Sequence, residues 1–120
     1  TIIPAFITRD GNPEMSFGVM GGSMQAQGHT QVMVRFADYR QNPQAAADAP
    51  RWRVSEGLDV VNVEQGISAA VLDELKSRGH RIAQADRWST DFGRAQLIYR
   101  MEDGYLAASE RRTDGQAVGF

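Results

Sequence analysis

Hydrophobic and polar positions follow a strand-like period at both ends of the chain and a helical period between them. Apolar, β-branched runs occupy residues 2–8 and 15–20, and the turn formers at 9–13 between them predict a β-hairpin. Runs of the same kind at 96–100 and 105–109 predict a second hairpin near the other end.

Helical periodicity begins after a pair of adjacent glycines, Gly21 and Gly22. One apolar stripe recurs at three- and four-residue steps, the spacing of a helix with one buried face, through His29, Val32, Met33, Phe36 and Tyr39. Gly28 interrupts this run and costs a helix about 1 kcal/mol relative to alanine. Either a neighbouring element packs closely against Gly28 or the helix starts later.

The middle of the chain predicts further helices and short strands. Asn42 is a suitable cap and Pro43 a suitable first residue for a short helix. Ser68 caps a clearer helix over residues 68–78, which ends before Gly79. Short strands are predicted at 52–54, 59–63 and 80–83.

The order of these elements predicts the fold class. Strands come first and last with helices between them, and the polar tail at 110–120 is expected to be irregular. This order predicts a single α+β domain over residues 1–120, in which helices pack against a mainly antiparallel sheet.

Composition narrows the classes of partner. Among 120 residues, 42% are hydrophobic and 23% are charged, as is usual for globular proteins. No apolar run approaches the roughly 20 residues of a membrane-spanning helix. The formal net charge is −2 and the basic residues are spread out, so neither a membrane nor nucleic acid is expected as a partner.

Cysteine and histidine usage argues against metal chemistry. The chain has no cysteine, and its two histidines, His29 and His80, lie far apart in the sequence. Disulfides and thiolate ligands are thereby excluded, and no residues stand at metal-ligand spacing. We therefore expect no metal site and no cofactor. The localisation stays open, since periplasm and cytoplasm both accept a chain without cysteine.

The glycine pair is the strongest local candidate for chemistry. Glycines between a strand and a helix bring backbone N–H groups to the helix N-terminus, which favours an anion or an oxyanion. The alternative is a tight turn in which glycine only supplies a positive φ. The local pattern favours the turn, because the lysine of a phosphate-binding loop is absent.

Several segments give the chain a resemblance to a known family. They are TIIPAF at the start, FGVMGG followed by QAQGH, NPQAAADAPRWR at 42–53 and ASERRTDGQAVGF at the end. In this order and at similar separation, they resemble the C-terminal part of the small subunit of the γ-glutamyltranspeptidase family, also called γ-glutamyltransferase or glutathione hydrolase. The resemblance runs almost from end to end.

This resemblance implies an N-terminal nucleophile hydrolase. In that family one precursor cuts itself into a large and a small subunit, which fold together as an αββα sandwich. A threonine freed at the start of the small subunit attacks γ-glutamyl amides such as glutathione, with its own α-amino group as the base. The implied partners are therefore a γ-glutamyl small molecule, the large subunit and the upstream part of the small subunit.

Thr1 is not expected to be that nucleophile. The chain reads Thr1-Ile2-Ile3-Pro4, whereas the family's nucleophilic threonine is typically followed by another threonine and a histidine. We expect Thr1 to mark a boundary and the nucleophile to lie upstream. The chain alone is then expected to be inactive.

The resemblance also assigns roles around the glycine pair. Gly21 and Gly22 correspond to the family's oxyanion hole, whose N–H groups stabilise the tetrahedral intermediate. Met20 stands where many members have proline, so the substrate preference stays open. Together with Met20, the residues Gln25, Gln27 and His29 are candidate substrate contacts. The alternatives are exposed surface for the glutamines and a hydrogen-bonded core residue for the histidine.

Other functions remain open at this point. One is a noncatalytic binding or self-association module, in which the glycines only make a turn. With either function, an exposed sheet face or sheet edge predicts homodimers of the chain. Another is a related N-terminal nucleophile amidohydrolase that acts on γ-linked polymers or acylated lactams.

Overall fold

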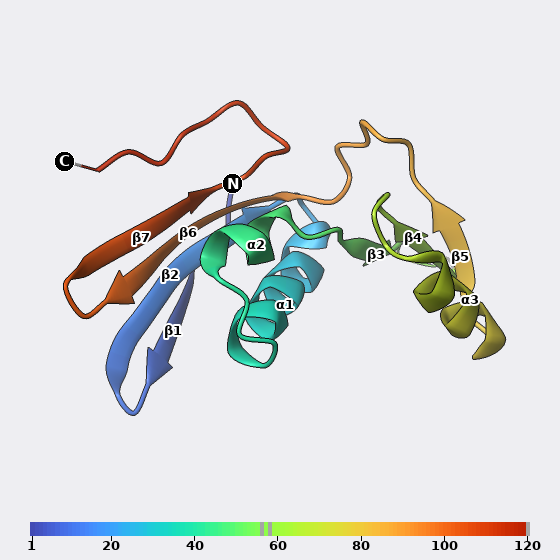
Figure 1. Cartoon of the computed structure of the whole chain (residues 1–120). Coiled ribbons are helices and arrows are strands. Elements are labelled where there is room, and N and C mark those ends of the chain that lie inside the picture. Colours follow the sequence, from blue (N-terminus) through green and yellow to red (C-terminus); the bar gives the residue numbers. More distant parts are fainter. Residues whose placement is uncertain (56, 58, 120) are drawn as a thin grey trace. The chain divides into compact units, whose positions relative to one another are not determined.

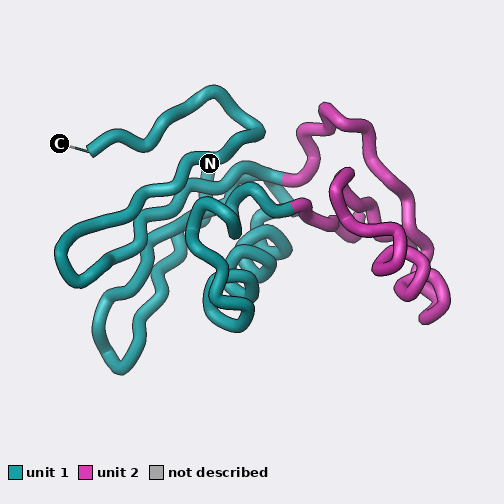
Figure 2. The backbone as a smooth tube through the Cα atoms, in the orientation of Figure 1, with its two compact units in different colours: residues 1–49, 93–120 teal, residues 50–92 magenta. Residues whose placement is uncertain are grey.

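The protein divides into two compact units. The structure, a computed structural model, describes residues 1–55, 57 and 59–119. Unit 1 comprises Thr1–Ala49 and Gly93–Phe120, and unit 2 comprises Pro50–Phe92 (Figure 2). The expectation of one domain over 1–120 stays a prediction.

Unit 1 is built on a four-stranded antiparallel sheet. Its strand order is β1-β2-β6-β7 (Figure 1), with bounds β1 Ala5–Arg9, β2 Asn12–Met20, β6 Arg94–Met101 and β7 Gly104–Ser109. Both predicted hairpins are confirmed. The first turn is tighter than predicted, because Asp10 and Gly11 both adopt positive φ, 51° and 78°, as a two-residue hairpin turn requires.

The helices of unit 1, α1 Met24–Ala37 and α2 Pro43–Asp48, pack on this sheet. At Gly28 of α1, an added Cβ would lie 2.7 Å from Val19 Cγ1 on β2. The first of the two explanations for Gly28 therefore holds: a neighbouring element packs closely there, and α1 begins directly after the glycine pair.

The core of unit 1 lies between these helices and the sheet. Its buried residues come from β2, α1, α2, β6 and β7, and they are Met15, Phe17, Val19, Val32, Ala47, Ala95, Leu97 and Ala108. Each large apolar side chain buried in this way contributes roughly 1.5–3 kcal/mol. Alternate residues of β2 and β6 therefore fix which face of the sheet meets the helices.

Helix α2 is fixed at its start and against an edge of the sheet. The Asn42 Oδ1 accepts from the Ala45 N–H at 2.8 Å, and Pro43 opens the helix, so the predicted cap is confirmed. The Gln44 Nε2 donates to the Ser109 O at 2.9 Å, and the Ser109 N–H donates to the Gln44 Oε1 at 3.2 Å. The side-chain amide of Gln44 thus pairs with the last residue of β7 as a neighbouring strand would.

The start of the C-terminal tail holds the end of α2. The Arg112 guanidinium donates to the Ala47 O and the Ala49 O, each at 3.0 Å. The buried Glu110 carboxylate pairs with Arg112 at 2.6 Å and accepts from the Ala95 N–H at 2.9 Å. The tail is irregular, as predicted, but its first residues are pinned to unit 1 by buried polar contacts.

Unit 2 carries a separate three-stranded sheet in the order β3-β4-β5. Strand β3, Trp52–Val54, is antiparallel to β4, Val60–Val63, and β4 is parallel to β5, Arg81–Gln84. Helix α3, Ala69–Ser77, lies between the parallel strands in sequence. A parallel pair needs such a crossover, and the prediction of a mainly antiparallel sheet did not include it.

Helix α3 begins after the predicted cap but buries little. The Ser68 Oγ accepts from the Val71 N–H at 3.4 Å, as the capping pattern predicted. The sequence places Val71, Leu72 and Leu75 on one apolar face of α3, but no residue of α3 is buried and Val71 is 50% exposed. Among the described residues of both units, no helix combines the length and the hydrophobicity needed to cross a membrane.

Candidate functional site

The glycine pair forms the turn between β2 and α1. Gly21 has φ +145° and Gly22 has φ +58°, in the region that favours glycine. The Gly21 O accepts from the Met24 N–H at 3.0 Å, and the Gly22 O accepts from the Gln25 N–H at 3.1 Å. The carbonyl groups of the pair thus start α1, and both the tight turn and the helix N-terminus are present.

The N–H groups of the pair remain available for hydrogen bonding. Within the described part of the chain, neither the Gly21 nor the Gly22 N–H donates a hydrogen bond. Gly21 is partly buried and Gly22 is exposed. N–H groups at this place are the unsatisfied donors of a helix N-terminus, where the helix dipole adds positive potential.

Gly93 packs against this turn and was missed by the sequence analysis. A Cβ at Gly21 would lie 2.9 Å from the Gly93 Cα, and a Cβ at Gly93 would lie 2.5 Å from the Met20 O. The two backbones therefore touch where the end of β2 meets the residue before β6. A glycine ahead of a predicted strand is the only local signal, and the chain has 12 glycines, so sequence alone does not single this one out.

Met20 and Arg94 lie next to the turn as sheet partners. Met20 is 38% exposed, and the Arg94 Nη1 lies 3.8 Å from its Sδ. The sequence pattern predicts this strand only from Gln96, two residues after the Arg94 at which β6 begins. The structure brings this guanidinium to the residue that precedes the glycine pair.

Gln25 and His29 both bind the backbone of Ile3. Gln25 is 6% exposed, and its Oε1 accepts from the Ile3 N–H at 2.6 Å. The His29 Nε2 lies 2.9 Å from the Ile3 O, and the ring packs on Phe17 with centroids 5.3 Å apart. The Nδ1 lies 2.5 Å from the Gln25 O, and a proton on either ring nitrogen lets the imidazole donate to the carbonyl that it faces. These contacts fit the alternative of a hydrogen-bonded histidine.

The remaining candidate for substrate contact, Gln27, lies on α1 and is partly buried. Its backbone O accepts from the Gln31 Nε2 at 3.1 Å. Substrate contact by Met20, Gln25, Gln27 and His29 stays a prediction, as does the oxyanion role of the glycine pair.

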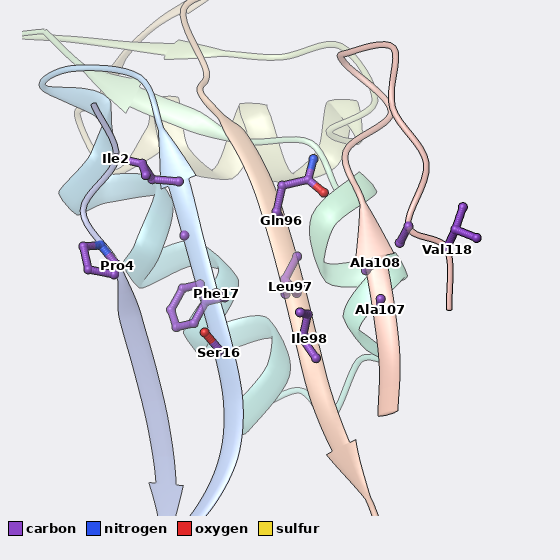
Figure 3. Close-up of a pocket in the computed structure, with 12 residues that line it drawn as sticks. Ile2, Pro4, Ser16, Phe17, Gln96, Leu97, Ile98, Ala107, Ala108 and Val118 are labelled. Atoms are coloured by element: carbon purple, nitrogen blue, oxygen red, sulfur yellow. The ribbon is translucent and has the colours of Figure 1, made fainter. Parts of the chain in front are cut away.

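A cavity of about 390 Å³ lies on the sheet of unit 1. Figure 3 shows Ile2 and Pro4 on one side of it, Val118 on the other, and Gln96 and Ile98 along β6. An added Cβ at Gly18, also in its lining, would meet the Ile2 Cδ1 at 2.7 Å. The segment before β1 is therefore packed directly on β2. The lining of the cavity is mostly apolar.

Solved structures place this arrangement among the N-terminal nucleophile hydrolases. The chain matches the crystal structure of cephalosporin acylase from Bacillus halodurans with a TM-score of 0.88 and 47% identity, over 97% of this chain and 22% of that one. It matches γ-glutamyltranspeptidase from Pseudomonas nitroreducens with a TM-score of 0.80 and 25% identity, over 100% of this chain and 61% of that one. The predicted α+β class, a layered part of that αββα fold, is confirmed.

Sequence comparison then gives the family. The γ-glutamyltranspeptidase family model matches residues 1–120. A glutathione hydrolase-like YwrD proenzyme from Bacillus subtilis (strain 168) is 32% identical over 125 residues, which cover 100% of this chain and 24% of that protein. The chain therefore belongs to the γ-glutamyltranspeptidase family.

The curated relatives are much longer than this chain. The glutathione hydrolase proenzyme of Escherichia coli (strain K12) is 29% identical over 119 residues, which cover 98% of this chain and 20% of that protein. The chain thus spans between a fifth and a quarter of the length of these two relatives.

Proposed function

We propose that this chain is the C-terminal part of the small subunit of a γ-glutamyltransferase or hydrolase. The parent protein cleaves γ-glutamyl amides such as glutathione by acyl transfer. Its nucleophile is the N-terminal threonine of the small subunit, which lies upstream of this chain and is freed by autoprocessing. The family match over residues 1–120 and the greater length of the relatives support this proposal.

The chemistry requires a site for a transient negative oxygen. The threonine hydroxyl attacks the amide carbonyl and gives its proton to the α-amino group. The carbonyl oxygen becomes an oxyanion. As the C–N bond breaks, the α-amino group passes that proton to the leaving amine and a γ-glutamyl ester of the threonine remains. Water or an acceptor amine then takes the γ-glutamyl group from this ester. In this scheme the N–H groups of Gly21 and Gly22 donate to the oxyanion.

One observation carries the oxyanion assignment. The N–H groups of the pair donate to nothing in the described part of the chain, and they stand at the N-terminus of a 14-residue helix. A helix of this length carries its macrodipole to that end. Preorganised donors of this kind are worth most in a site from which water is excluded.

An amide-to-ester replacement tests this assignment. A semisynthetic full-length protein with glycolic acid at position 22 loses one N–H and keeps the flexibility of glycine. Loss of one oxyanion donor lowers kcat by about 10²–10³-fold, so a loss of that size with little change in KM is expected. The same replacement at the exposed Gly119 is the control, and an unchanged kcat at position 22 contradicts the oxyanion role.

The activity is tested with a chromogenic γ-glutamyl p-nitroanilide. The full-length protein is expected to release nitroaniline, faster with glycylglycine as acceptor, and alanine in place of the upstream threonine is expected to abolish release. The present chain alone is expected to release none, because it has donors for an oxyanion and no nucleophile. Release by the chain alone, lost in Thr1→Ala, would overturn the placement of the nucleophile.

A related acylase activity is the second candidate. The 47% identity and TM-score of 0.88 to a cephalosporin acylase favour it. The same glycine pair would serve, with another acyl group. The experiment measures kcat/KM of the full-length protein for two substrates, the γ-glutamyl anilide and a cephalosporin with an amide-linked side chain. The higher value shows whether γ-glutamyl transfer or acylase activity is the main one.

Partners form the last part of the proposal. The large subunit and the upstream part of the small subunit are proposed to pack with this chain in the parent. The chain alone exposes large apolar side chains, with Phe6 63% and Ile98 52% exposed, so homodimers are expected for it. Light scattering after size exclusion measures this, and a monomer at high concentration contradicts it. A noncatalytic binding module would keep the dimer and show no turnover in the parent.

A further inference from the structure

Arg94 places a guanidinium beside the glycine turn. It opens β6 opposite Met20, the residue before Gly21. The Arg94 Nη1 donates to the Met20 Sδ at 3.8 Å, and a thioether is a weak acceptor. Among residues 1–55, 57 and 59–119, no carboxylate lies within ion-pair distance of this guanidinium.

The Nε end of the Arg94 side chain is shielded from solvent. Arg94 is partly buried, and its Nε is buried with no hydrogen-bond partner in the described structure. A buried donor left unsatisfied costs about 1–3 kcal/mol, more if it is charged. Arginine presents a rigid fork of donors that matches a carboxylate through two parallel hydrogen bonds. The Arg94 side chain thus offers the donors that a carboxylate would accept from.

The position of Arg94 on the sheet links it to the cavity of Figure 3. Successive strand residues point to opposite faces, so Arg94 shares a face with Gln96 and Ile98. Both of these line the cavity, together with Gly18 on β2. The sheet register pairs Gly18 with Gln96 and Met20 with Arg94. Arg94 therefore continues the cavity's row of side chains to the end of the sheet where the glycine turn lies.

We propose that Arg94 binds a carboxylate of the substrate next to the amide that reacts at the glycine turn. This inference rests on the proposed function and makes Arg94 a residue that determines specificity. A γ-glutamyl amide carries one carboxylate on its acyl side. A peptide leaving group or acceptor carries another on the far side of the reacting bond. The guanidinium would bind the acyl-side carboxylate and the carboxylate of the leaving group or acceptor in the same way. The experiment therefore tests each carboxylate with its own pair of substrates.

The first experiment measures selectivity in the full-length protein. Arg94→Met keeps an apolar stem beside Met20 and removes the charge. The acyl arm compares γ-glutamyl with γ-aminobutyryl p-nitroanilide, which lacks the acyl-side carboxylate. The leaving-group arm compares γ-glutamyl carboxynitroanilide with γ-glutamyl p-nitroanilide. The kcat/KM ratio of one arm is expected to fall about tenfold or more in Arg94→Met, as loss of a charge-assisted hydrogen bond predicts.

The matched control is Arg100→Met on the same strand and face. The Arg100 side chain is exposed and its Nη1 donates to the Pro13 O at 3.5 Å, at the end of β6 away from the turn. Both ratios are expected to stay unchanged in this variant. If both also stay unchanged in Arg94→Met, or if Arg100→Met loses as much, the proposal is overturned.

A binding experiment separates this inference from the proposed function. Calorimetric titration with L-glutamate probes the acyl-side carboxylate, and titration with glycylglycine probes the other, with no turnover required. Kd for one probe is expected to rise about tenfold or more in Arg94→Met. If no anilide is cleaved, the proposed function fails while the titration still decides the role of Arg94. Equal Kd values, or no binding of either probe by the parent, overturn it.

Folding of the variants is checked separately. Thermal unfolding shows whether Arg94→Met is folded, and Arg94→Lys serves if it is not. Lysine keeps the charge and loses the paired donors, so it is expected to retain part of the selectivity. If a folded Arg94→Met and Arg94→Lys both keep the kcat/KM ratios of the parent, Arg94 does not bind a carboxylate.

Discussion

The two units bury their apolar side chains very differently. In unit 1 the helices and the sheet enclose a continuous core that includes Met15, Val19, Val32 and Leu97. In unit 2 the buried hydrophobic residues among those described are Val63 and Phe92, and α3 buries none. Apolar packing therefore accounts for the fold of unit 1 and for much less of unit 2.

Unit 2 instead relies on polar contacts around a buried arginine. Arg51 is 1% exposed, and its Nη1 donates to the Phe92 O at 3.0 Å. The Arg51 N–H donates to the Glu64 Oε2 at 2.7 Å, and the Glu64 N–H donates to the Arg51 O at 2.9 Å. Such contacts specify one geometry but depend on every partner. The difference predicts that the two units respond to different substitutions.

Replacing Arg51 is expected to have the largest effect. Arg51→Met removes the buried guanidinium and leaves the Phe92 carbonyl without this donor, and a buried acceptor left unsatisfied costs up to about 3 kcal/mol. Amide hydrogen exchange should accelerate in β4 and β5 while β2 stays protected. Equal acceleration in β2 would show that the units do not differ in this way.

Gly93→Ala tests the contact at the glycine turn in unit 1. The new Cβ would lie 2.5 Å from the Met20 O at φ +70°, and overpacking with backbone strain is expected to cost about 3 kcal/mol. Gly79→Ala in unit 2 is the matched control, since φ is +92° there and nothing lies within 4 Å. It should cost about 1 kcal/mol. Urea unfolding of the chain measures both, and equal losses refute a steric contact.

A matched pair of valines compares the two cores directly. Val32 in α1 is 0% exposed and Val71 in α3 is 50% exposed. Val32→Ala is expected to lower the free energy of unfolding by about 2 kcal/mol, and Val71→Ala to change it by less than about 0.5 kcal/mol. A large loss at Val71 would mean that the apolar face of α3 is covered in solution, as self-association would do.

The helix caps provide the smallest contrast. The Asn42 cap has a hydrogen bond of 2.8 Å and the Ser68 cap one of 3.4 Å. Asn42→Ala is expected to cost about 1 kcal/mol and Ser68→Ala about 0.5 kcal/mol. Urea denaturation measures both losses, and the reverse order would contradict the assignment of the stronger cap to unit 1.

Local signals explain what the sequence predicted correctly. The hairpins and the caps at Asn42 and Ser68 depend on residues close together in the chain. Turn and cap chemistry acts over a few residues, so its signature is readable. The family resemblance added the assignment of the glycine pair, which the local pattern had left open.

Long-range contacts explain what the sequence did not reveal. The approach of Gly93 to Gly21, the pairing of Met20 with Arg94 and the hold of Gln25 on Ile3 join residues far apart in the chain. The spacing of hydrophobic residues indicates whether a segment is a helix or a strand, but it does not indicate which strands are neighbours. The parallel pair of β4 and β5 was missed for the same reason, because a run of apolar residues does not state the direction of its neighbour.

The amide of Gln44 gives the open edge of β7 a further property. An unpaired edge strand is a template on which another chain can add a strand and begin aggregation. At Ser109 the outward backbone donor and acceptor are already occupied by a side chain of α2. A strand approaching that end of β7 would have to displace a hydrogen-bonded glutamine first, so the helix shields the sheet from unwanted extension at this point.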